Sequence, residues 1–193
     1  MKKHYLLIGA LVVSMVFILN NINMLKHEGN ECLDDEKIEN FALDHNINIL
    51  SVENLSNYSI ISYDTISKYG IMSLFIDKQT GDIGYIDNNV NLSSNTDKLV
   101  HLQFTLENVD SNFIGIYIVD TELVRKAKDI TIEFKKNTSE DGTYKITIST
   151  NKHRSVLISY IDKRSLKDVQ RITILDENGN IIHTKTLIEK ITI

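Results

Sequence analysis

The sequence predicts an α+β N-terminal module followed by an all-β, immunoglobulin-like sandwich, both behind an N-terminal transmembrane helix. Three patterns support this fold class. An apolar segment opens the chain, an amphipathic segment and short strand-like runs cover residues 34–87, and regular apolar–polar alternation covers residues 98–193. We therefore expect three parts: a signal-anchor or transmembrane segment over residues 1–25, a small module over 34–87 and an antiparallel β-sandwich over 98–193.

The N-terminal segment is long enough to cross a bilayer. Residues 5–25 carry no charged side chain, and a helix of that length matches a hydrocarbon core of about 30 Å. Lys2 and Lys3 precede it, so the positive-inside rule keeps the N-terminus cytoplasmic and exports the C-terminal part. These features predict a single-pass protein of the cell membrane, with the lipid bilayer bound through residues 5–25.

Three fates are possible for this segment: a cleaved secretory signal, a lipoprotein signal ending at Cys32 and an uncleaved anchor. A cleaved secretory signal needs small residues just after the apolar run, and residues 19–25 contain no Ala, Gly or Ser. A lipid-modified cysteine also needs small residues before it, and Cys32 follows Gly29, Asn30 and Glu31 instead. Both observations favour an uncleaved signal anchor, and secretion after cleavage is the alternative.

Residues 34–87 begin with a helical pattern and continue with strands. Asp34, Asp35 and Glu36 suit a helix N-terminus, and apolar residues three and four apart predict a short helix over residues 34–46. Strand-like runs follow at 47–52, 58–63 and 71–76, and a turn at 77–81 leads into a fourth run at 83–86. Residues 87–97 are polar and predict a linker or a long loop.

The second half alternates with a period of two, which predicts strands that bury one face and expose the other. The alternating runs cover residues 100–106, 114–118, 130–134, 144–148, 156–160, 172–174 and 182–188. Seven short strands with turn signals between them are typical of a small antiparallel sandwich. Residues 121–128 predict a short helical connection, and residues 165–168 match a capping box.

One motif supports a family resemblance. The segment Asp77-Lys78-Gln79-Thr80-Gly81-Asp82-Ile83 follows an apolar strand, and with the preceding helix and strands, residues 38–87 resemble a PepSY-type module. The resemblance implies an extracytoplasmic module that binds or restrains a partner, often a peptidase. A generic hairpin is the alternative, because Asp and Gly start and close many turns.

The sequence offers no catalytic, cofactor-binding or metal-binding residues. No two of its histidines lie two to four residues apart (His4, His27, His45, His101, His153 and His183), and Cys32 is the one cysteine. Asp176, Asn178 and Asn180 alternate as in calcium loops, but Leu187 stands where an EF-hand has Glu, so a hairpin turn is the better interpretation. Motifs for a serine nucleophile or for phosphate binding are also missing.

Charge narrows the possible partners. Residues 26–193 hold 19 Lys and Arg against 26 Asp and Glu, a net charge of −7, which argues against nucleic acid as a partner. We expect a non-catalytic binding or interaction protein of a bacterium, with a protein partner at the outer membrane face or in the cell wall and no cofactor. The alternatives are an extracytoplasmic enzyme with a site between the two modules, and an accessory subunit of a membrane complex.

Overall fold

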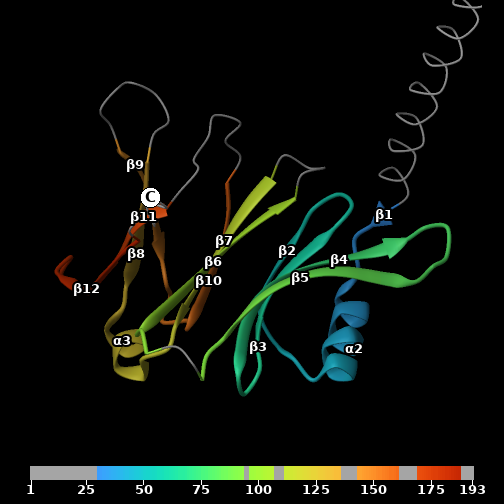
Figure 1. Ribbon diagram of the computed structural model, residues 1–193, viewed down its shortest axis with the longest axis horizontal. Helices are drawn as coiled ribbons and strands as arrows, with labels where there is room; N and C mark the ends of the chain where they lie inside the picture. Colours follow the sequence, from blue (N-terminus) through green and yellow to red (C-terminus); the bar gives the residue numbers. More distant parts are fainter. Residues whose placement is uncertain (1–29, 94–95, 107–110, 136–142, 161–168, 188–193) are drawn as a thin grey trace, which may run out of the picture.

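The structure is a computed structural model that describes residues 30–93, 96–106, 111–135, 143–160 and 169–187. These residues form three antiparallel sheets and two short helices. The sheets lie one beside another across the molecule, and helix α2 (Asp35–His45) lies at one end of the stack (Figure 1).

The first sheet comes from the N-terminal half of the described chain. Its strands are β1 (Asn30–Glu31), β2 (Asn48–Asn54), β3 (Ser59–Asp64), β4 (Lys68–Asp77) and β5 (Ile83–Asn91). Strand β4 is central because three strands pair with it. Strand β3 pairs with residues 69–74 of β4, β1 pairs with residues 76–77, and β5 pairs with residues 68–76. Residues 87–91, which the sequence placed in a linker or loop, are therefore the end of strand β5.

Two further sheets follow. The middle sheet has the order β10-β7-β6, from β6 (Leu99–Leu106), β7 (Ser111–Ile118) and β10 (Ser155–Tyr160). The last sheet has the order β12-β11-β8-β9, from β8 (Asp129–Lys135), β9 (Thr143–Ser149), β11 (Val169–Leu175) and β12 (Ile181–Thr186). Helix α3 (Thr121–Lys126) connects β7 to β8, as the sequence predicted.

Helix α2 forms where the sequence predicts it, and its ends explain its length. The Asp34 side chain accepts a hydrogen bond from the Lys37 backbone N–H at 2.8 Å, which caps the helix and lowers the pKa of Asp34. Asn46 ends the helix in the left-handed conformation, with φ of 53°. Ile38 and Phe41 are buried against the first sheet, so α2 covers one face of that sheet.

The middle sheet is buried on both faces. One face contributes Ile114, Ile116 and Ile118 to a core shared with the last sheet. The opposite face contributes Phe104 and Phe113 to a core shared with the first sheet. Burying each of these large side chains contributes about 1.5–3 kcal/mol, so both contacts are substantial parts of the fold.

Hydrogen bonds join the first and middle sheets through this second contact. Ser155 Oγ lies 3.3 Å from Ser62 Oγ and 3.4 Å from the Tyr69 hydroxyl oxygen. Beside them, the Tyr117 hydroxyl donates to Asp64 Oδ2 at 3.0 Å. Because buried hydroxyl groups without partners are costly, this polar seam favours one relative position of the two sheets.

The predicted fold class, an α+β module and an immunoglobulin-like sandwich behind a transmembrane helix, is wrong. The described chain is mostly β-strand with two short helices, arranged as three stacked sheets. The physical reason is that the middle sheet has no wet face, whereas the alternation was interpreted as one buried face and one exposed face. No helix in the described ranges is long and apolar enough to cross a membrane, and the segment expected to do so, residues 1–25, lies outside them.

The predicted strands, capping box and domain boundaries have different outcomes. Each strand-like run proposed from the sequence overlaps an observed strand. The capping box at residues 165–168 lies outside the described residues. The division of the chain at residues 34–87 and 98–193 into two modules stays a prediction, although the two parts pack directly on each other.

The close approach of the first and middle sheets can be tested at Gly115. A Cβ atom at this position would overlap the Tyr69 hydroxyl and lie 2.8 Å from Ile71 Cδ1. We expect Gly115→Ala to lower the free energy of unfolding by about 1–3 kcal/mol, because overpacking separates the sheets. The double variant Gly115→Ala/Tyr69→Phe removes the overlapping hydroxyl. Its loss of unfolding free energy, measured by urea unfolding, should therefore be smaller than the sum of the losses in the two single variants.

The matched control for this experiment is Gly70→Ala. A Cβ at Gly70 would overlap the Tyr63 ring on the helix-covered face of the first sheet, so Tyr69→Phe should not compensate for it. Strict additivity of Gly115→Ala and Tyr69→Phe would contradict the close contact between the two sheets.

Candidate functional site

A groove between α2 and the β4–β5 hairpin is the candidate binding site, and we call it the helix–hairpin groove. Both elements contribute side chains of mixed character. The helix side is lined by Lys37, Asn40, Phe41, Asp44 and His45, and the hairpin side by Ile76, Gly81, Asp82, Ile83 and Tyr85.

Three rings form the aromatic part of this groove. The His45 ring stacks on Phe41 with centroids 3.9 Å apart and an interplanar angle of 20°. Tyr85 meets both rings edge-on, with centroids 5.6 Å from Phe41 and 5.7 Å from His45. Edge-to-face pairs are favourable arrangements of aromatic rings, so the three rings support one another while the Tyr85 side chain remains half-exposed.

Simple periodicities place these residues together. Phe41 and His45 are one helical turn apart and lie on the same face of α2. Ile83 and Tyr85 alternate along β5 and lie opposite Ile76 and Leu74 of β4, on the face of the sheet that α2 covers. Ile83 and Tyr85 therefore line the groove beside Phe41 and His45 of α2, and both remain partly exposed.

The hairpin turn closes one end of the groove. Gly81 has φ of 78° and donates from its N–H to the Asp77 carbonyl oxygen at 2.6 Å. The Asp77 side chain accepts from the Gln79 N–H at 2.8 Å, and the Asp82 N–H donates to Thr80 Oγ1 at 3.2 Å. The residues of the PepSY-like motif thus build a tight turn, and Asp82 lies at the rim of the groove.

Strand β5 exposes an unusual amount of apolar surface. Ile83 is 37% exposed, and Tyr85 and Ile86 are each 51% exposed. They account for three of the eight large apolar side chains that are exposed in the described residues. Ile83 and Tyr85 point to the face that carries the groove, and Ile86 points to the opposite face. Isolated exposed apolar residues are ordinary on protein surfaces, whereas neighbouring ones that line a groove indicate an interaction site.

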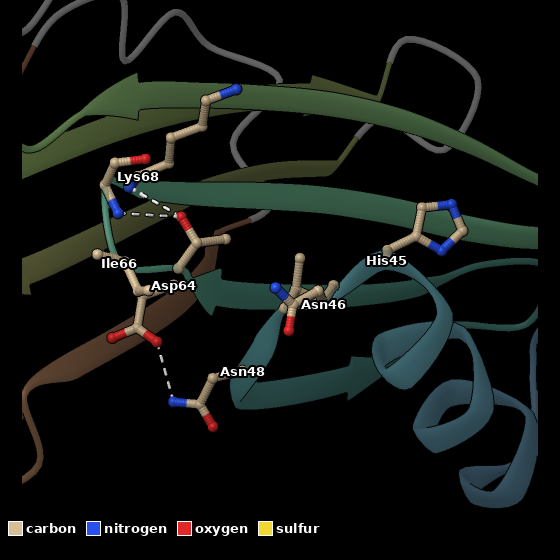
Figure 2. A pocket seen from close by; sticks show the side chains of 9 residues that line it. His45, Asn46, Asn48, Asp64, Ile66 and Lys68 are labelled. Carbon is tan, nitrogen blue, oxygen red and sulfur yellow. Dashed lines mark hydrogen bonds between the residues drawn. The ribbon is translucent and has the colours of Figure 1, made fainter.

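A second, more polar hollow lies at the C-terminal end of α2, and Figure 2 shows its side chains. Asn48 donates from its side chain to Asp64 at 2.9 Å, and Thr65 Oγ1 accepts from the backbone N–H of Lys68 at 3.0 Å. These bonds hold the β3–β4 turn, which leaves Ile66 fully exposed. His45 borders both hollows, but no nucleophile and general base come together here among the described residues.

The calcium-loop alternative at Asp176 is answered by the geometry. Asp176 Oδ1 accepts from the N–H groups of Asn178 and Asn180 at 2.9 and 2.8 Å, and these bonds lower the pKa of Asp176. Gly179 has φ of 79°. The hairpin interpretation is confirmed, and within the described ranges no group of His, Cys, Asp and Glu could hold a metal ion.

The structure brings two of the six histidines near one lysine. Lys185 on β12 donates to Asp97 Oδ2 at 2.8 Å and to the Leu99 carbonyl at 2.9 Å. Burial and then the Lys185 charge lower the pKa of His101 on β6, and burial and then Lys98 lower the pKa of His183 on β12. This cluster fastens the last sheet to the middle sheet, and burial, together with the nearby lysines, opposes a positive charge on either histidine.

Sequence reasoning did not identify the helix–hairpin groove. It assigned residues 34–46 to an amphipathic helix and residues 83–86 to a strand. The available signal was Ile83-Gly84-Tyr85-Ile86, which has apolar residues on both faces of a strand that ends a sheet. Cys32, which the sequence left without a role, is half-buried beside β1 and has no disulfide partner.

Comparison with known proteins adds no relative. No family model, no curated protein and no solved structure matches this chain. The PepSY-type resemblance of residues 38–87 therefore stays a prediction, and function must be argued from the site itself.

The histidine cluster predicts a pH dependence of stability. A histidine whose pKa is lowered below its ordinary 6.5 in the folded state binds a proton more readily when unfolded. The free energy of unfolding should therefore decrease as the pH falls below about 6.5, well above the range where carboxylates titrate. Thermal unfolding at a series of pH values should show that His101→Gln reduces this slope, and His183→Gln reduces it less because His183 is less buried. An unchanged slope in the double variant would contradict the prediction.

Proposed function

We propose that this protein is a non-catalytic interaction protein at the outer face of a bacterial membrane. Residues 5–25 anchor it in the lipid bilayer, its N-terminus is cytoplasmic, and the helix–hairpin groove binds a protein partner. The observation that carries this proposal is the pair of exposed apolar side chains on β5, Ile83 and Tyr85, which line the groove beside the Phe41 and His45 rings of α2.

The composition of the groove supports binding of a protein segment. Aromatic residues are enriched in protein interfaces because they bury a large area at a small cost in side-chain entropy. Here one ring, Tyr85, is half-exposed while Phe41 and His45 hold its position. A ring fixed before binding loses little freedom when a partner covers it.

An enzyme with a site between the two modules has less support. The space between the first and middle sheets is occupied by buried side chains such as Phe104, Phe113 and Ile71. Four hydroxyl groups there, on Ser62, Tyr69, Tyr117 and Ser155, take part in hydrogen bonds across the seam, and Ser73 Oγ is buried without a partner. Such a contact resembles a structural core more than a substrate cavity.

The proposal can be tested by cross-linking in native membranes. A photoreactive amino acid in place of Tyr85 should give a covalent adduct with one partner protein, because a bound partner would cover this ring. The matched control is the same replacement at Tyr144, a tyrosine on β9 that is 45% exposed and far along the chain from the groove. Adducts would be identified by mass spectrometry after a high-salt wash of the membranes.

Two results would overturn the proposal. Equal labelling at residues 85 and 144 would show that the groove has no particular partner. Full-length protein released from the membrane pellet by the high-salt wash would show that residues 5–25 do not anchor it.

A further inference from the structure

We propose that the partner presents an extended, positively charged segment that adds as a strand to the free edge of β5. This inference rests on the proposed function and specifies the chemistry of the partner. Three independent features of the groove point to the same occupant: its backbone edge, its side-chain spacing and its charge.

The backbone edge of β5 is available for pairing. One edge of β5 pairs with β4 from Ile83 to Asn91, and no strand of the described chain pairs with the other edge. Towards its C-terminal end, Asn88 donates to the Gln103 carbonyl of β6 at 2.8 Å, so the accessible part is Ile83–Asp87. This part contains no Pro and no Lys, the residues that commonly protect strand edges from further pairing. An edge with unpaired N–H and C=O groups can accept an extended peptide.

Side-chain spacing favours an extended occupant. Alternate side chains of a strand point to the same face, so every second residue of an added strand would point to the face that carries Ile83 and Tyr85. There it would lie beside the Tyr85 ring, which is half-exposed. An apolar residue at these positions would cover the ring, and the residues between them would point to the other face, where Ile86 is exposed.

The charge of the two flanking elements is strongly negative. Residues 34–45 and 77–87 hold eight Asp and Glu against two Lys, a net charge of −6, while the whole chain has −5. Lys37, which lines the groove, is paired with Asp34 at 3.1 Å. Asp44 and Asp82 line the groove as well, and neither forms an ion pair in the part of the chain that is described. A basic segment is therefore complementary to this face, and complementarity of charge speeds and selects association.

The same charge disfavours other occupants. A second copy of the chain paired through β5 would bring together two surfaces that each carry a net charge of −6, and these would repel each other. Nucleic acids are repelled for the same reason. A polypeptide is preferred over other cations because only a peptide backbone can supply alternating donors and acceptors to a strand edge.

Binding of defined peptides to the full chain in detergent micelles tests the inference. The probe is a labelled peptide of about ten residues in which Lys and Val alternate, a length that covers a typical strand. Two matched peptides carry Glu in place of Lys, or Pro in place of the central Val. By fluorescence anisotropy we expect the basic peptide to bind with a Kd at least about tenfold lower than either matched peptide, and more weakly at high salt.

Variants locate the binding to the groove. Asp44→Asn/Asp82→Asn should raise the Kd of the basic peptide by about fivefold or more, since two charges beside it are removed. The control Glu122→Gln/Glu177→Gln removes the same charge from exposed positions outside the groove and outside residues 34–45 and 77–87, and it should change the Kd by less than about twofold. Circular dichroism of both variants establishes that they are folded.

The outcomes separate this inference from the proposed function. Equal affinity for the basic, acidic and proline-containing peptides, or equal effects of the two double variants, would overturn the strand-addition proposal. If Tyr85 is still cross-linked specifically in native membranes, the proposed function stands and the partner has other chemistry. If that cross-link is also absent, both are overturned.

Discussion

The burial of both faces of the middle sheet is the constraint on which the rest of the structure depends. Strand β7 is buried at seven of its eight positions, so it must have a packing partner above and below. The last sheet covers the face of Ile114, Ile116 and Ile118, and the first sheet covers the face of Phe113 and Tyr117. Neither contact can be removed without exposing a large apolar area, and the three sheets are therefore held in one order.

This stacking decides where a partner can bind. The spaces between the sheets are filled by core side chains, and the hydroxyl groups of Ser62, Ser155 and Tyr117 form hydrogen bonds that join the first and middle sheets. Surface that is free for recognition lies at the ends of the stack, and at one end α2 covers only part of the first sheet (Figure 1). The uncovered part, next to β5, combines exposed apolar side chains with an open strand edge. The candidate site thus lies where the face of the first sheet that α2 covers reaches the edge strand β5.

Local structure could be predicted from the sequence, but the arrangement of the sheets could not. The helix at Asp35–His45 follows from its acidic cap and its apolar spacing, and the turns at Gly81 and Gly179 follow from glycine's freedom to adopt positive φ. The sequence did not reveal that β7 is buried on both faces. Its isoleucines already provide one complete apolar face, and one such face is all that a strand of an ordinary sandwich needs. The second set, Phe113, Gly115 and Tyr117, is equally apolar, but no local rule says what covers it. The groove was missed for a related reason, since the exposure of Tyr85 depends on where α2 ends in space.

Native-state hydrogen exchange of the full chain tests the central claim most directly. If the middle sheet holds the other two, the amides of β4, β7 and β8 should lose their protection together as urea is added, with one common free energy of opening. Exchange of the β4 amides at urea concentrations that leave β7 fully protected would contradict the account, because the first sheet would then open without exposing the face of the middle sheet that it covers.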